Sequence, residues 1–134
     1  MKALWEIRHV SVSIARRPGE VYDFASKPEN LPRWANGLAR GTVRQINGEW
    51  IADAPMGKIR IRFAERNDFG VLDHDVTLES GITIHNPMRV LPNDTGSEVV
   101  FSIARLPDVS AAKFEDDAKA VAADLQALKR VLEQ

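Results

Sequence analysis

Residues 17–34 read RPGEVYDFASKPENLPRW, and this stretch predicts two short helices in close succession. Pro18 suits the first position of a helix because its φ angle is preset, and Glu20 places negative charge at the helix N-terminus. A second helix is expected over about Pro28 to Ala35. Pro32 limits it to roughly one regular turn before a disruption. Two such helices, followed by a block of strands and one long helix, make a frame that few folds satisfy.

A strand is expected immediately before these helices, from Trp5 to Ala15. Every second residue from Val10 to Ile14 is apolar, and this period of two turns one face of the strand inward. Trp5 and Ile7 lie on the opposite parity. We therefore expect either a bulge near Arg8 or a start of the strand that buries both faces.

The middle of the chain predicts six further strands, which makes about seven in all. We expect them over residues 42–46, 49–52, 58–64, 71–78, 82–91 and 97–105. Asn47-Gly48 separates the first two and is a strong hairpin signal, because both residues tolerate positive φ. Short turns join most of the others, so the strands are expected to form an antiparallel sheet.

The hairpin around residues 79–81 can be paired in two registers. A three-residue loop places His74 opposite Asn86, with both side chains pointing toward the interior. A two-residue turn would instead bury His85 and expose Ile84. Hydrophobic matching favours the three-residue loop, because a slip of one residue moves every side chain to the other face.

The last helix is expected from about Ser110 to Leu132 and has the clearest pattern in the chain. Ser110 is a good N-cap, and Lys129 and Arg130 suit the negative end of the helix dipole. Its apolar side chains form one stripe at helical spacing, made of Phe114, Ala118, Val121, Leu125, Leu128 and Leu132. One isolated helix cannot bury such a stripe, so the sheet must cover it. The fold class that follows is α+β, with a curved antiparallel sheet wrapped around the C-terminal helix and a cavity between them.

The composition limits the kinds of site that this chain can hold. At 134 residues it is expected to be one domain, residues 1–134, and its net charge of −1 provides no field that would attract nucleic acid. It contains no cysteine, which excludes disulfides and thiolate ligands. The three histidines lack metal-ligand spacing and no glycine-rich phosphate loop occurs, so we expect neither a metal nor a cofactor.

Nothing in the sequence predicts association with a membrane. No run approaches the ~20 apolar residues of a membrane span. Charges interrupt the apolar residues near the N-terminus before they could form a signal peptide. We therefore expect a cytoplasmic protein without integral membrane association.

Four segments together resemble a known superfamily. They are EVYDF at residues 20–24, NLPRW at residues 30–34, DHDVT at residues 73–77 and HNPMRV at residues 85–90. The pattern resembles the START-like or SRPBCC superfamily, and within it the polyketide cyclase/dehydrase and lipid-transport-like branch, in a bacterial subgroup of single-domain members. This resemblance covers essentially the whole chain. It implies a helix-grip fold with a hydrophobic cavity between the sheet and the C-terminal helix.

The resemblance leaves the chemistry open, because members carry lipids, bind hormones, cyclise polyketides, host metal centres or regulate chaperones. We expect this chain to bind a small hydrophobic or amphipathic molecule in the cavity, for transport or sequestration. The residues expected to contact it are Trp34, Ile61, Phe63, His74, Asn86, Met88, Phe101, Phe114, Val121 and Leu125. The oligomeric state does not follow from the sequence.

Two alternative functions use the same fold. In an enzyme of the cyclase or dehydratase type, His74 would be the catalytic candidate and would transfer a proton within the cavity. In a protein-interaction module of the chaperone-activator type, the cavity would be collapsed and a contiguous apolar patch would be exposed. His85, facing Asp75 across the strands, is expected to form a solvated pair.

Overall fold

The structure is a computed structural model that describes residues 3–36, 38–39 and 41–134. Its strands are β1 (Ile7–Ile14), β2 (Val43–Ile46), β3 (Glu49–Ala54), β4 (Gly57–Phe63), β5 (His74–Thr77), β6 (Thr83–Asn86), β7 (Met88–Asn93) and β8 (Gly96–Ala104). Its helices are α1 (Pro18–Ala25), the 3₁₀ turn η1 (Pro28–Asn30), α2 (Leu31–Trp34) and α3 (Ala111–Leu132). The expected α+β class, the two short helices and the long C-terminal helix are confirmed.

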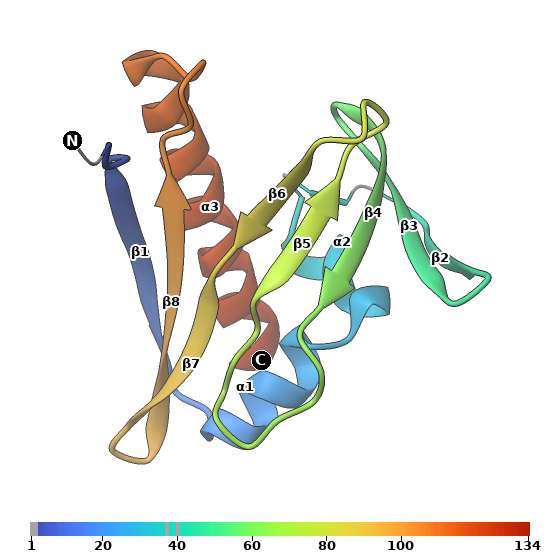
Figure 1. The fold of residues 1–134 in the computed structure, drawn as a ribbon. Helices are drawn as coiled ribbons and strands as arrows, with labels where there is room; N and C mark the ends of the chain where they lie inside the picture. Colours follow the sequence, from blue (N-terminus) through green and yellow to red (C-terminus); the bar gives the residue numbers. More distant parts are fainter. Residues whose placement is uncertain (1–2, 37, 40) are drawn as a thin grey trace.

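The strands form two antiparallel sheets. One has three strands in the order β1-β8-β7, and the other has five in the order β2-β3-β4-β5-β6. The first strand therefore pairs with the last, from Ile7 opposite Ala104 to Ile14 opposite Ser97. Figure 1 shows the two sheets side by side, with α3 running along the three-stranded sheet. The main contacts of α3 are with β1 and α2.

The expected strand over residues 82–91 is divided, so the described part of the chain has eight strands rather than seven. Pro87 lies at the division. It accepts a hydrogen bond from the Ser102 amide at 3.0 Å but has no amide hydrogen to return, so the ladder between β7 and β8 ends there. Along the edge that does not pair with β8, β7 faces the segment before β5. Among the described residues these two segments share one isolated bridge, between Val71 and Arg89. The division places β6 and β7 in different sheets.

The hairpin register predicted for residues 74–86 is confirmed. His74 lies opposite Asn86, and Asp75 lies opposite His85. The amide of Leu78 donates to the carbonyl of Ile82 at 2.9 Å, which closes the three-residue loop. The inward and outward faces of the five-stranded sheet are therefore those expected from the alternation of apolar residues.

The expectation for the start of β1 is wrong. Pairing with β8 is continuous through Arg8, so there is no bulge in that ladder. Nor does the start of this strand bury both of its faces, because Trp5 is 55% exposed and Ile7 is 49% exposed. These two side chains lie beyond the part of β1 that packs against the core.

The main core lies between the two sheets and the helices. Its largest completely buried members include Ile14, Leu31, Ile59, Met88 and Leu125. Leu125 and Leu128 come from the predicted stripe of α3. Phe114 and Ala118, which belong to the same stripe, are buried outside this main cluster.

Candidate functional site

His74 occupies the inner face of β5, where the two sheets meet. It is 3% exposed, and its ring centroid lies 4.9 Å from that of Phe63 and 5.7 Å from that of Phe101. Asn86 lies opposite His74 across the ladder, and Met88 lies opposite Phe101. The structure thus brings five of the predicted residues together. We call Phe63, His74, Asn86, Met88 and Phe101 the His74 cluster.

The hydrogen bonding of His74 determines which of its nitrogens carries the proton. Nδ1 lies 3.0 Å from the carbonyl oxygen of Leu72, which can only accept, so Nδ1 is the protonated nitrogen. Burial lowers the pKa of His74, and this effect exceeds the opposing influence of the Leu72 carbonyl and of Asp73. The ring is therefore neutral at physiological pH, and Nε2 carries a lone pair. Among the described residues none forms a hydrogen bond with Nε2.

A hollow opens beside Phe63, the one member of the His74 cluster that lines it. Its volume is about 700 Å³, within the range of small-molecule sites, and it is open on one side. It is lined by Ser26, Pro28, Asn47, Gly48, Glu49, Trp50, Arg60, Ile61, Arg62, Phe63, Asp75 and Thr77. Phe63 belongs both to this lining and to the ring pair with His74. Among the described residues of α3, none lines the hollow.

Trp34, at the end of α2, carries the one buried polar side-chain atom without a partner in the described part of the chain. The residue is 3% exposed and its indole Nε1–H makes no hydrogen bond. It belongs to the main core, together with Ile61 and Leu125. A buried donor left without an acceptor costs about 1–3 kcal/mol, so this group calls for an explanation.

The remaining predicted residues are divided between the core and the far end of α3. Ile61 and Leu125 are buried in the main core, and Val121 is half-buried against it. Phe114 is buried elsewhere, with the guanidinium of Arg8 5.0 Å from its ring centroid. The structure therefore does not bring Phe114 to the other candidates.

Ser26 and Pro28 line the hollow but were not among the predicted residues. Ser26 follows α1 directly, and Pro28 is the first residue of η1. Their presence in the same lining as Trp50 and Ile61 depends on how the helices dock against the five-stranded sheet. Neither hydropathy nor spacing carries that information, so no signal in the sequence would have found them.

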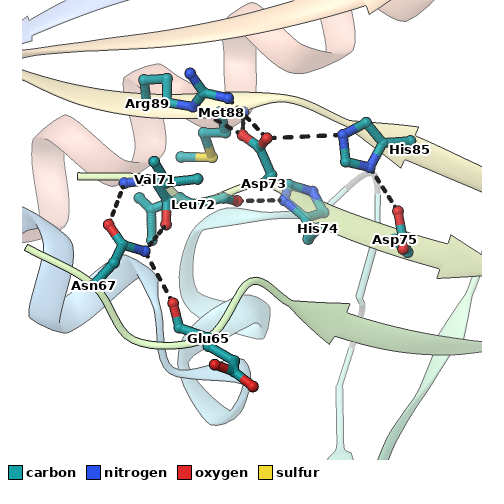
Figure 2. Close-up of polar contacts among 10 residues, drawn as sticks. All are labelled: Glu65, Asn67, Val71, Leu72, Asp73, His74, Asp75, His85, Met88 and Arg89. Carbon is teal, nitrogen blue, oxygen red and sulfur yellow. Dashed lines mark hydrogen bonds and ion pairs between the residues drawn. The ribbon is translucent and has the colours of Figure 1, made fainter. Parts of the chain in front are cut away.

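The outer face of β5 and β6 carries a polar network, shown in Figure 2. Asp73 accepts hydrogen bonds from Nε and Nη2 of Arg89, at 3.0 and 2.8 Å, and from the Met88 amide at 2.9 Å. His85 lies 2.7 Å from Asp75 and 3.8 Å from Asp73, and its side chain is largely exposed. This matches the solvated pair expected for His85 and Asp75.

The protonation of Asp73 is controlled by these contacts. Burial pushes its pKa upward, but the hydrogen bonds from Arg89 and the Met88 amide, together with the Arg89 charge, bring the pKa below its usual value. Asp73 is therefore an anion at physiological pH. It fastens β7 to the segment that leads into β5.

No three His, Cys, Asp or Glu side chains in residues 3–36, 38–39 and 41–134 come together as a metal site. Over the same residues, no helix is long and apolar enough to cross a membrane.

The chain matches one protein family over nearly its whole length. A sequence model of the family described as polyketide cyclase / dehydrase and lipid transport covers residues 8–133. No curated protein matches the chain significantly in sequence.

Solved structures share the fold at low sequence identity. XoxI from Bacillus cereus is 17% identical with a TM-score of 0.73, covering 96% of this chain and 98% of that one. The Aha1 dimer from Colwellia psychrerythraea is 12% identical with a TM-score of 0.73, covering 96% of each chain. DynU16, from the dynemicin biosynthetic locus, is 15% identical with a TM-score of 0.72, covering 96% of this chain and 47% of that one. At these identities the likeness shows the fold alone.

Proposed function

Because the chain belongs to the polyketide cyclase / dehydrase and lipid transport family, we propose that it binds a small hydrophobic or amphipathic molecule against the inner face of the five-stranded sheet. The molecule enters through the hollow beside η1 and reaches the His74 cluster past Phe63. The hollow is large enough for a small molecule, and Phe63 lies both in its wall and against His74. Phe63 and Phe101 offer flat apolar contacts, and Met88 offers an adaptable one.

The observation that carries this proposal is the state of His74. A neutral imidazole lies between two aromatic rings, with its Nδ1 proton committed to Leu72 and its Nε2 lone pair unused by the described residues. A single oriented polar group in an apolar setting is the usual arrangement of a small-molecule site. Nε2 accepts a hydrogen bond from a hydroxyl or amide of the ligand.

The first test is native mass spectrometry of the purified protein, followed by solvent extraction of anything bound. We expect a discrete extra mass that is lost on denaturation. In parallel, the neutral fluorescent probe N-phenyl-1-naphthylamine is titrated into the extracted protein, and saturable binding is expected. Absence of both the extra mass and saturable probe binding would contradict the proposal.

The role of His74 is tested with 2-naphthol, which carries a hydroxyl donor, and with 2-methylnaphthalene, which does not. Both compete with the fluorescent probe. The loss of one hydrogen bond in His74→Leu should weaken 2-naphthol by about 3–10-fold and leave 2-methylnaphthalene nearly unchanged. His85→Leu, a change on the outer face, is the matched control and should leave both affinities as they are. Equal effects on the two ligands would remove His74 from the binding site.

The alternative of a cyclase or dehydratase is supported by the same histidine. A lowered pKa keeps Nε2 unprotonated at neutral pH, as a general base requires. The test is to incubate the molecule extracted from the protein with the wild-type protein and with His74→Gln, and to analyse it by mass spectrometry. Turnover by the wild type that His74→Gln lacks would favour the enzyme. If the molecule is unchanged after incubation with either protein, the enzyme hypothesis fails and the binding function stands without it.

A further inference from the structure

The buried indole N–H of Trp34 has no acceptor among the described residues. We infer that this N–H is a recognition group that donates a hydrogen bond to an oxygen of the bound molecule. The ligand is then an oxygenated apolar compound such as a ketone, ester or ether, rather than a pure hydrocarbon. This inference rests on the proposed function and specifies the chemical class of its ligand.

Other buried polar side chains in the described part of the chain each make at least one internal hydrogen bond. Ser97 Oγ donates to the Arg16 carbonyl at 2.7 Å, and the Tyr22 hydroxyl accepts from the Asn67 amide at 3.0 Å. His74 is bonded through Nδ1 to Leu72. Trp34 differs from these residues, because its side chain makes no hydrogen bond with the described residues. A phenylalanine at that position would supply an aromatic ring without burying a donor.

The location of Trp34 connects it with the proposed entry route. Trp34 and Ile61 belong to the same buried cluster, and Ile61 also lines the hollow. α2, which carries Trp34, follows directly on η1, whose Pro28 lies in the same lining, and α2 packs against α3. Trp34 itself does not line the hollow, so the molecule reaches the indole N–H only by extending inward past Ile61 into this cluster.

Trp34 and His74 have complementary hydrogen-bonding roles. The indole nitrogen can only donate, whereas Nε2 of the neutral His74 can only accept. An interior that offers one donor and one acceptor suits a ligand with both a carbonyl or ether oxygen and a hydroxyl. Hydrocarbon chains satisfy neither group and leave the donor unpaired.

The test compares 2-acetylnaphthalene with 2-isopropenylnaphthalene, which has nearly the same shape but a methylene group in place of the carbonyl oxygen. Each competes with N-phenyl-1-naphthylamine for the wild-type protein. We expect the wild type to prefer the ketone by about 3–10-fold, the equivalent of one net hydrogen bond. Trp34→Phe should reduce this ratio to about 1 while the alkene still binds. Trp5→Phe, which changes an exposed tryptophan that does not line the hollow, is the control and should keep the ratio.

A second measurement uses the intact protein and does not depend on the folding of a variant. The indole ¹⁵N–¹H resonances of Trp5, Trp34 and Trp50 are assigned with single Trp→Phe variants of Trp5 and Trp50. We expect the Trp34 indole proton to move downfield with the ketone and to remain nearly in place with the alkene.

The outcomes separate this inference from the proposed function. If 2-acetylnaphthalene and 2-isopropenylnaphthalene both bind but the ketone preference and the indole shift are absent, Trp34 is not a recognition group and the binding function stands. If the ketone preference is equal in the wild type and Trp34→Phe, the inference is likewise overturned. If neither 2-acetylnaphthalene nor 2-isopropenylnaphthalene binds and no indole resonance moves, the proposed function itself fails.

Discussion

Asp73 and His74 replace one backbone hydrogen bond of the sheet with two side-chain hydrogen bonds. The Leu72 amide donates to the Met88 carbonyl at 2.8 Å, and in a regular antiparallel pair the Met88 amide would donate back to Leu72. Here the Met88 amide donates to Asp73 and the Leu72 carbonyl accepts from His74 Nδ1. The backbone thus selects the tautomer of His74, and with it Nε2 as the nitrogen left without a hydrogen-bond partner among the described residues.

His74 makes the stability of the protein depend on pH. Because burial lowers its pKa in the folded state, the unfolded chain, with a histidine pKa of about 6.5, binds the proton first as the pH falls. The contribution of neutral His74 is complete above about pH 6.5 and is lost below it, with a slope of at most about 1.4 kcal/mol per pH unit.

We expect urea unfolding at pH 7.5, 6.5 and 5.5 to show this loss in the wild type and a shallower loss in His74→Leu. His9→Gln is the control, since His9 is exposed and hydrogen-bonds Ser102 on the surface. That variant should follow the wild type. An undiminished slope in His74→Leu would show that another group titrates.

Asp73 should stabilise the protein through its charge and through the Met88 amide. Asp73→Ala removes the Arg89 pair and leaves that amide without its acceptor, so we expect a loss of about 1–3 kcal/mol in the free energy of unfolding. Asp73→Asn keeps an oxygen for the Met88 amide and should lose less. Urea unfolding at pH 7 measures both variants, and equal losses would contradict the role given to the amide contact.

The lowered pKa of Asp73 predicts the pH range of its contribution. The contribution is present above the unfolded pKa of about 3.9 and disappears as the pH falls through the lower folded value. The stabilities of Asp73→Asn and the wild type should therefore converge in strong acid. If the difference in the free energy of unfolding between the wild type and Asp73→Asn stays constant into strong acid, the stabilisation by Asp73 comes from its shape rather than its charge.

Among the elements, the hairpin of β5 and β6 shows what could be predicted from the sequence. Matching apolar residues across its loop yielded the correct register, and with it the inward positions of His74 and Asn86. The division at Pro87 was not predicted, because it depends on β8 as the neighbour of β7 and on the Asp73 carboxylate. Both are tertiary facts that hydropathy does not contain.

Pro87→Ala tests this account of the division. The substitution introduces an amide hydrogen at position 87, facing the carbonyl of Ser102, whose own amide already donates to the carbonyl at that position. We expect the new amide to be protected in hydrogen exchange, and β7 to extend toward β6. Exchange of that amide as fast as in an unstructured peptide would mean that Asp73 alone causes the division.

α3 illustrates both the success and the limit of a periodic pattern. Its N-cap was predicted correctly, with Ser110 Oγ accepting the Lys113 amide at 3.1 Å. The stripe was buried as expected at Leu125 and Leu128, but Phe114 packs beneath Arg8 at the far end. Periodicity identifies the face of a helix that is buried, and it does not identify the elements that cover each turn.

Leu125→Ala measures the contribution of α3 to the core. Leu125 is 1% exposed within the main cluster, and the cavity left by this change should lower the free energy of unfolding by about 2–5 kcal/mol. Gln126→Ala, at an exposed position one residue later, should change it by less than about 0.5 kcal/mol. A loss near zero at Leu125 would contradict the packing of α3 described above.

For the whole molecule, the family resemblance carried more of the prediction than any single residue. It supplied the helix-grip arrangement, which the structure confirms. It did not supply the hollow beside η1, which lies away from the described residues of α3. Nor did it reveal the unpaired Trp34 donor, because hydrogen-bond satisfaction depends on every neighbour of a buried group and not on the residue type alone.

The pairing of β1 with β8 has a consequence for the order in which the protein is made. On the ribosome, β1 emerges early, but its partner is not complete until residue 104 has been synthesised. Until then β1 has an unpaired edge and its apolar Val10, Val12 and Ile14 lack their native cover, a state that exposes a chain to aggregation. Such long-range pairing also slows folding. Nascent chains stalled before β8 should therefore bind chaperones, whereas chains released after α3 should not.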